Sequence, residues 1–202
     1  MEMAIIILAA GQSKRMRGLD KLTQKVSGLP QIRLITLLAC KVSAKVIVAL
    51  PDAAHPRSIC LLGLPIERCF ILNSQIGMGY SLASAASMLK KNLHSGVMII
   101  PADMPELTRD DIELLMTTHL KNPAVIAQAV SANGTAGHPV VFPNRCFTSL
   151  TTLKGDQGAR ALIAQDKKAI AYIELPDTHA STDLDTPEDW TSWRYKTKPY
   201  KV

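Results

Sequence analysis

The sequence predicts an α/β fold with a mainly parallel central sheet. Short apolar segments alternate along the chain with longer segments whose apolar residues recur at helical spacing. The short segments are continuously apolar rather than alternating with polar residues, which is typical of strands covered by helices on both faces. Sheets of this kind bind ligands at the carboxyl ends of their strands, so we expect the functional residues to follow the strands directly.

Six apolar runs are predicted as strands, namely residues 4–9, 46–50, 69–72, 97–100, 125–129 and 140–142. Three segments between them, residues 32–42, 82–89 and 112–120, have the amphipathic pattern of helices. Local signals place further helix starts at Thr108, where Asp111 completes a capping box, and at Thr186, which precedes Pro187. A short helix is also expected over residues 158–164.

Length and composition favour one globular domain. The chain has 202 residues, 47% of them hydrophobic and 20% charged, without repeats or Gly/Ser linkers. We expect a single domain over residues 1–193, followed by a basic and mobile tail over residues 194–202 that lacks apolar periodicity. The longest apolar run has eight residues against about 20 for a membrane span, so no membrane partner is expected. Because basic residues follow that run instead of preceding it, we expect no secretory signal and a cytoplasmic protein.

The excess positive charge is concentrated in two segments. The formal net charge is +6, and residues 14–25 and 194–202 each carry +4, which leaves the rest of the chain slightly acidic. A single basic loop on a nearly neutral body favours a compact anion such as a triphosphate over a nucleic-acid backbone. The four cysteines lack zinc-ligand spacing and lie among apolar neighbours, so we expect neither zinc nor disulfides.

The loop after the first strand has the composition of a phosphate site. Small residues, Leu8-Ala9-Ala10-Gly11, let backbone amides approach a ligand, and Lys14, Arg15 and Lys21 follow with positive charge. Neither the P-loop pattern nor GxGxxG is present, which argues against ATPases and dinucleotide-binding dehydrogenases. The alternative interpretation is an ordinary basic surface loop.

A carboxylate at the end of another strand predicts a metal site. Asp103 follows the run 97–100 and is expected at the same edge of the sheet as the basic loop. Beside a triphosphate, one or two carboxylates suit Mg²⁺, which keeps phosphate and water oxygens in its shell. Asp103 is not needed as a helix cap, because Thr108 fills that role. Asp183 and Asp185 are the available second carboxylates.

These residues, with several further motifs, resemble those of the molybdenum cofactor cytidylyltransferases in the molybdopterin nucleotidyltransferase-like family. The resemblance runs almost end to end. It includes Asn73…Gly77-Met78-Gly79…Ser81, Ala102-Asp103-Met104-Pro105, Gly137-His138-Pro139, Gly155-Asp156-Gln157-Gly158-Ala159-Arg160 and Asp183-Leu184-Asp185-Thr186-Pro187. It implies a three-layer Rossmann-like nucleotidyltransferase fold with a mainly parallel central sheet.

The resemblance also implies roles for individual residues. Those expected to act in catalysis are Arg15, Lys21 and Asp103, and those expected to contact the nucleotide are Leu8, Ala9, Ala10, Gly11 and Ser81. Asp103 and Asp183 are the implied Mg²⁺ ligands, with Asp185 as the alternative to Asp183. Residues implied near the acceptor substrate are Asn73, Gly79, His138, Asp156 and Arg160.

Some of these assignments have a structural alternative. Ser81 is either a base contact or a helix N-cap, and His138 is either a ligand or the residue that fixes a tight turn. Asp156 and Arg160 either line the acceptor site or start a helix. The family often has glycine at the position of Arg17, whose side chain either adds a phosphate contact or changes the loop conformation.

The implied reaction transfers CMP from CTP to the terminal phosphate of the molybdopterin cofactor and releases pyrophosphate. Ala10 favours CTP, because guanylyl relatives typically carry a second glycine there. The expected partners are CTP, molybdopterin and a molybdenum hydroxylase or its maturation factor. Alternatives are guanylyl or other nucleotidyl transfer to a related acceptor, and a noncatalytic chaperone that carries the cofactor to a hydroxylase.

Overall fold

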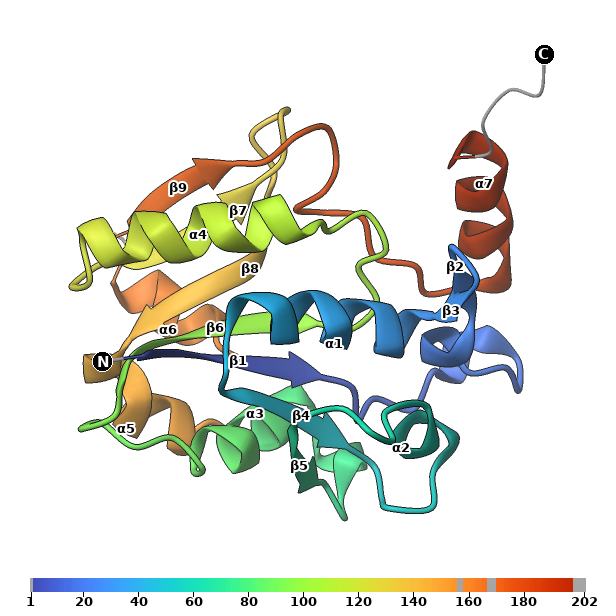
Figure 1. Cartoon of the computed structure of the whole chain (residues 1–202), viewed down its shortest axis with the longest axis horizontal. Helices are drawn as coiled ribbons and strands as arrows, with labels where there is room; N and C mark the ends of the chain where they lie inside the picture. Colours follow the sequence, from blue (N-terminus) through green and yellow to red (C-terminus); the bar gives the residue numbers. More distant parts are fainter. Residues whose placement is uncertain (1, 156–157, 167–169, 198–202) are drawn as a thin grey trace.

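A seven-stranded sheet forms the centre of the protein (Figure 1). The computed structural model describes residues 2–155, 158–166 and 170–197. The strand order is β5-β4-β1-β6-β8-β7-β9. The strands are β1 (Glu2–Leu8), β4 (Val46–Leu50), β5 (Glu67–Phe70), β6 (His94–Pro101), β7 (Ile126–Val130), β8 (Ala136–Pro143) and β9 (Ile170–Glu174), and β2 (Lys25–Val26) with β3 (Leu29–Pro30) forms a separate hairpin.

Most neighbouring strands of the sheet are parallel. β1 pairs in parallel with both β4 and β6, β4 with β5, and β7 with β9. β8 is the exception, since it runs antiparallel to β6 and to β7. The predicted α/β class with a mainly parallel sheet is therefore confirmed.

Helices cover both faces of the sheet and make a three-layer structure (Figure 1). α1 and α4 lie on one face, and α3, α5 and α6 lie on the other. The helices are α1 (Gln31–Val42), α2 (Pro56–Cys60), α3 (Met78–Ala86), α4 (Arg109–Lys121), α5 (Phe147–Thr151), α6 (Arg160–Gln165) and α7 (Pro187–Thr197), with short 3-10 turns η1 (Lys14–Met16), η2 (Lys21–Thr23), η3 (Ser74–Ile76) and η4 (Asn144–Cys146).

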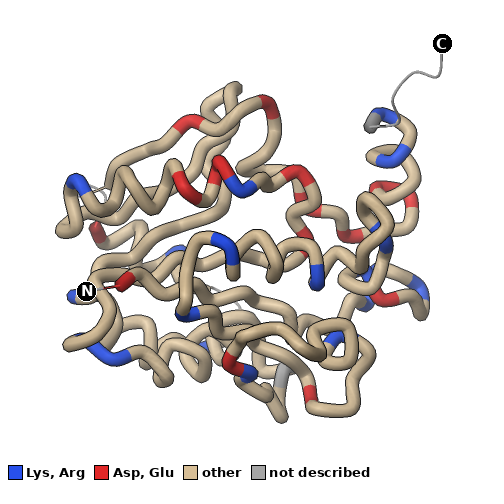
Figure 2. The backbone as a smooth tube through the Cα atoms, viewed as in Figure 1, with Lys and Arg blue, Asp and Glu red and all other residues tan. Residues whose placement is uncertain are grey.

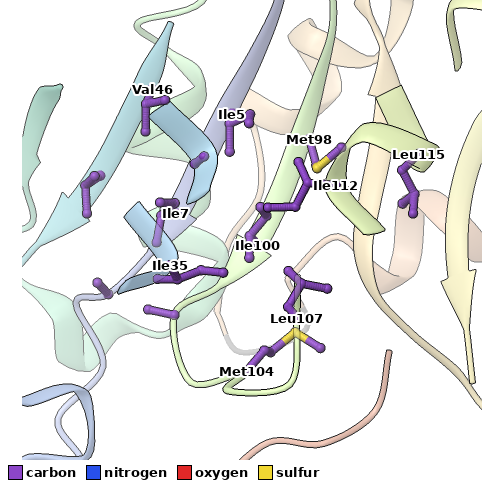
Figure 3. Packing of buried hydrophobic residues seen from close by; sticks show 14 of the residues in the cluster. Ile5, Ile7, Ile35, Val46, Met98, Ile100, Met104, Leu107, Ile112 and Leu115 are labelled. Carbon is purple, nitrogen blue, oxygen red and sulfur yellow. The ribbon is translucent and has the colours of Figure 1, made fainter. Parts of the chain in front are cut away.

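Strand β1 shows why its residues are continuously apolar. Ile5 and Ile7 point into the core beneath α1 and α4, where they pack with Ile35 and Ile112 (Figure 3). Ala4 and Ile6 point to the opposite face and join the core beneath α3 and α5. Since both faces of β1 are buried, neither set of side chains can be polar.

All six predicted strands are present, with boundaries shifted by a few residues. The sequence analysis missed β9, an edge strand whose short apolar run, Ile170-Ala171-Tyr172-Ile173, has no fully buried side chain. Helix α4 begins as predicted, with Thr108 accepting from the Asp111 N–H and the Asp111 side chain accepting from the Thr108 N–H.

Helices α3 and α7 depart from the expected boundaries. α3 begins four residues early, at Met78, with Gly77 as its N-cap at φ 120°. Ser81 is therefore inside the helix, and the N-cap interpretation of Ser81 is wrong. α7 continues to Thr197, so Arg194 and Lys196 of the expected tail are helical, and residues 198–202 lie outside the described residues. Among the helices described, none is both long and apolar enough to cross a membrane.

Candidate functional site

The carboxyl ends of β1 and β6 lie side by side and define the candidate site. The last residues of the two strands, Leu8 and Pro101, are paired in the parallel register. The Ala102 N–H extends the pairing by donating to the Leu8 carbonyl at 3.1 Å. The chain leaves β1 toward β4 on one side and returns to β6 on the other, so this is the switch point at which α/β sheets bind ligands.

The loop after β1 is folded against α7. Met16 is buried and packs with Leu184 and Trp190, which lead into and lie within α7. Arg17 adopts a left-handed backbone conformation, φ 52°, which explains why glycine suits this position. Its guanidinium pairs with Glu188 of α7 at 2.9 Å. The Arg17 side chain therefore points toward α7 and lines neither of the cavities described below.

Basic residues of this loop face acidic residues of the segment before α7 (Figure 2). The Lys21 ammonium donates to Asp103 and, at 2.7 Å, to Asp185. Arg15 pairs with the other oxygen of Asp185 at 2.6 Å. Burial lowers the pKa of Lys21, but the charges of Asp103 and Asp185 and the hydrogen bonds to them outweigh burial and raise this pKa above its usual value. Lys21 is therefore a positive charge held between Asp103, at the end of β6, and Asp185, in the segment before α7.

Asp183 completes a concentration of negative charge. Desolvation, followed by the charges of Asp103 and Asp185, raises the pKa of Asp183 above its usual value, and Lys21 acts in the opposite direction. A divalent cation beside Asp103 and Asp183 would relieve that repulsion, so the carboxylates fit an oxygen-seeking metal. Within the described part of the chain, no three His, Cys, Asp or Glu side chains gather as a metal cluster.

Two cavities meet at this point. The loop cavity, of about 460 Å³, lies along residues 8–15 and reaches Lys21, Ser81 and Asp185. The sheet cavity, of about 440 Å³, extends over β6 and β8 toward α6. Both are lined by Leu8, Met78, Pro101 and Asp103. Asp103 thus stands where two bound molecules would meet.

The structure brings most of the predicted residues to these cavities. Those lining the loop cavity are Leu8, Ala9, Ala10, Gly11, Arg15, Lys21, Ser81, Asp103 and Asp185. Those lining the sheet cavity include His138, Arg160 and Asp183. Asp183 and Asp185 therefore face different cavities on either side of Asp103.

Three predicted acceptor residues are not placed at either cavity. Asn73 is exposed in the turn before η3 and lines neither cavity. Gly79 is buried, and a Cβ there would lie 2.8 Å from the carbonyl oxygens of Lys154 and Gly155, so close packing explains this glycine. Asp156 lies outside the described residues.

The Gly-His-Pro segment packs against the chain that leads to Asp183. A Cβ at Gly137 would lie 1.8 Å from the Ala180 carbonyl oxygen, which also accepts from the His138 N–H at 2.8 Å. Burial lowers the pKa of His138, so the ring is neutral near pH 7. Its Nδ1 is buried and meets no partner among the described residues. The segment therefore both fixes a close backbone contact and presents a polar ring at the sheet cavity.

Glu106, which sequence reasoning missed, holds the acidic segment in place. Its Oε2 accepts from Thr178 at 2.7 Å and from Thr182 at 2.9 Å, and its Oε1 accepts from Trp193 Nε1 at 3.1 Å. Beside it, the His179 ring lies 2.8 Å from the Asp111 carboxylate. The only signal in the sequence was the closeness of Glu106 to Asp103.

Comparison with known proteins identifies the class of protein as a nucleotidyltransferase. Residues 5–170 match the MobA-like NTP transferase domain. The chain belongs to that family and is a nucleotidyltransferase of the MobA-like type.

Named relatives and solved structures cover nearly the whole chain. Purine catabolism protein PucB of Bacillus subtilis (strain 168) is 29% identical over 92% of each chain. A probable molybdenum cofactor guanylyltransferase of Rhodopirellula baltica is 25% identical, also over 92% of each. Rv0371c of Mycobacterium tuberculosis superimposes with a TM-score of 0.82 at 20% identity, covering 96% of this chain and 97% of that one. A manganese complex of Rv0371c gives a TM-score of 0.76 at 19% identity, covering 95% and 97%.

Replacing Glu106 with Ala is expected to loosen the segment that carries Asp183 and Asp185. The change removes a charged acceptor of three hydrogen bonds, so the free energy of unfolding should fall by about 1–3 kcal/mol. Urea denaturation measures this change in the free energy of unfolding. Glu113→Ala is the matched control, because Glu113 is half-exposed and pairs only within α4. Equal losses in the two variants would contradict a role for Glu106 in holding this segment.

Proposed function

We propose that this nucleotidyltransferase transfers CMP from CTP to the terminal phosphate of the molybdopterin cofactor and releases pyrophosphate. The observation that carries the proposal is that Asp103, which accepts from the Lys21 ammonium, lines both cavities. The loop cavity offers small residues and cations to a nucleoside triphosphate. The sheet cavity offers His138 and Arg160 to an anionic acceptor.

The reaction forms a bond between an acceptor phosphate oxygen and the α-phosphorus of CTP while the bond to the β-phosphate oxygen breaks. The attacking oxygen is already ionised, so no side chain has to remove a proton. What the protein must supply is alignment of two polyanions and neutralisation of their charge. The arrangement of two cavities around one charged junction suits that task.

Lys21 and Arg15 supply the protein's own positive charge. An ammonium has three N–H donors, and Lys21 directs two of them at Asp103 and Asp185. Its third donor remains for a phosphate oxygen in the loop cavity. Arg15 is mostly exposed, and its guanidinium keeps donors beyond the bond to Asp185 for the same triphosphate.

Asp103 and Asp183 are the residues that would hold the divalent cation, with Mg²⁺ as the proposed ion. Nucleotidyltransferases of this family typically use a divalent metal. Bound there, the ion would offset negative charge on the phosphates. Asp185 is already shared between Lys21 and Arg15, which supports Asp183 over Asp185 as the second ligand.

Guanylyl transfer is the second candidate, because a relative with 25% identity is named a probable molybdenum cofactor guanylyltransferase. The support for CTP is Ala10. It lines the loop cavity at the position where guanylyl relatives typically carry a second glycine, and the proposal is that the added methyl group narrows the space for a purine.

Nucleotide choice is tested by pyrophosphate release with molybdopterin, Mg²⁺ and either CTP or GTP. We expect wild type to prefer CTP, and Ala10→Gly to move the ratio of kcat/KM toward GTP. One methyl group discriminates by about 1–3 kcal/mol, so the shift should be partial. A wild-type preference for GTP would favour the guanylyl alternative. Nucleotide binding without any pyrophosphate release would favour a cofactor-carrying chaperone.

The metal assignment is tested by Asp103→Asn and Asp183→Asn, each of which removes a charge at nearly constant size. Turnover at saturating Mg²⁺ should fall about 100-fold in each. The double variant should be scarcely worse, because both residues act on one ion. Asp110→Asn is the control, since Asp110 is exposed on α4. Near-normal turnover in Asp103→Asn would overturn the assignment. If Asp183→Asn alone is silent, the second ligand becomes Asp185.

A further inference from the structure

Arg57 is a buried arginine whose side-chain hydrogen bonds all go to the loop that lines the proposed nucleotide site. It is the second residue of α2, and it is only 2% exposed. Its Nη1 donates to the carbonyl oxygens of Ala9 and Gly11, each at 2.6 Å. Its Nη2 donates to Ser13 Oγ at 2.8 Å, and its Nε donates to Asp20 at 2.7 Å. Four of the five guanidinium N–H donors are thus used within one loop.

These bonds set the direction of the loop's backbone N–H groups. In a trans peptide the carbonyl and the following N–H point in opposite directions. Since the Ala9 and Gly11 carbonyls both point at Arg57, the N–H groups of Ala10 and Gln12 point away from it. Neither N–H finds an acceptor within the described part of the chain. The loop therefore presents two donors on the side away from α2.

That side of the loop is the loop cavity. Ala10 and Gln12 line both the loop cavity and a shallower hollow on the α2 side, whereas Arg57 lines only the hollow. Lys21, Ser81 and Asp103 line the loop cavity and not the hollow. Arg57 and the proposed ligand are thus on opposite sides of the same stretch of backbone.

The same guanidinium reaches the turn that carries Lys21. Asp20 accepts from Arg57 with one carboxylate oxygen and from the Leu22 N–H, at 2.9 Å, with the other. Asp20 is the N-cap of η2, whose first residue is Lys21. Arg57 and Asp20 therefore connect the start of the loop with its cationic end.

We infer that Arg57 is a positioning residue for the nucleotide. It turns two backbone donors toward the triphosphate or base and fixes the turn from which Lys21 extends. The inference rests on the proposed function. Arg57 does not itself contact the nucleotide, because it is buried and its donors are directed into the protein. Its guanidinium charge is balanced locally by Asp20.

The test compares Arg57→Met and Arg57→Lys with a matched control. Arg33→Met is that control, because the Arg33 guanidinium also binds α2, by donating to the Cys60 carbonyl at 2.6 Å, but its hydrogen bonds go to Cys60 and Leu62 and not to the loop. Two quantities are measured. One is amide hydrogen exchange of residues 9–13 in the ligand-free protein, and the other is kcat and KM for the nucleotide that wild type prefers.

Arg57→Met is expected to speed exchange over residues 9–13 and to raise the nucleotide KM at least 10-fold, with kcat changed less. A rise in KM of this kind reports lost binding rather than lost chemistry. Arg57→Lys should recover part of both effects, since a lysine keeps the charge and can reach one or two of the acceptors. Arg33→Met should leave exchange in the loop and KM as in wild type.

The inference is overturned if Arg57→Met leaves loop exchange and KM unchanged, or if Arg33→Met reproduces both changes. If Arg57→Met does not fold, Asp20→Asn replaces it, because the amide presents a donor to Arg57 Nε and should produce the same pair of effects. A folded Asp20→Asn with wild-type exchange and KM would overturn the inference as well. Amide hydrogen exchange can be measured whether or not the protein is active. A wild-type protein that transfers no nucleotide would therefore reject the proposed function without deciding the exchange test of Arg57.

Discussion

Parallel pairing of β1 with β6 is the constraint on which the rest of the structure depends. It places the ends of two strands, more than 90 residues apart in sequence, at one edge of a sheet whose faces are both buried. This pairing alone therefore brings the loop after β1 next to Asp103, which follows β6.

Opposite charge then organises the residues around that edge. The loop after β1 is basic, and the segment before α7 is acidic, so the two attract each other at several points. An exposed pair such as Arg17 with Glu188 contributes only about 0–1 kcal/mol. Apolar contact of Met16 with Trp190 provides the firmer attachment of the loop to α7. The charges near Asp103 therefore contribute little to the stability of the fold, and their importance lies in where they are placed.

Much of this arrangement was predictable from the sequence, because short sequence patterns specify it. The apolar run of β1 with the small residues directly after it, and the apolar run of β6 with Asp103 directly after it, are each recognisable within one short stretch of sequence. Arg57 and Glu106 were not predictable in the same way, since their partners lie 37 to 48 and 72 to 87 residues away. An isolated arginine or glutamate gives no sign of which distant backbone it will contact.

Two errors have local physical causes. Strand β9 lies at the sheet edge, where none of the side chains of its short apolar run is fully buried. Helix α3 starts at Gly77, whose positive φ only glycine adopts readily, and this moves Ser81 into the helix and onto the loop cavity. The earlier helix start removes the N-cap alternative and leaves Ser81 as a predicted nucleotide contact.

We propose that a nucleoside triphosphate and a divalent cation bind together at the junction of the two cavities. Thermal unfolding with CTP, GTP or ATP, each with and without Mg²⁺, tests this most directly, because a ligand that binds only the folded state raises the melting temperature. The account predicts stabilisation by CTP with Mg²⁺ that exceeds the effect of CTP or Mg²⁺ alone. An unchanged melting temperature with every triphosphate and Mg²⁺ at millimolar concentration would contradict it.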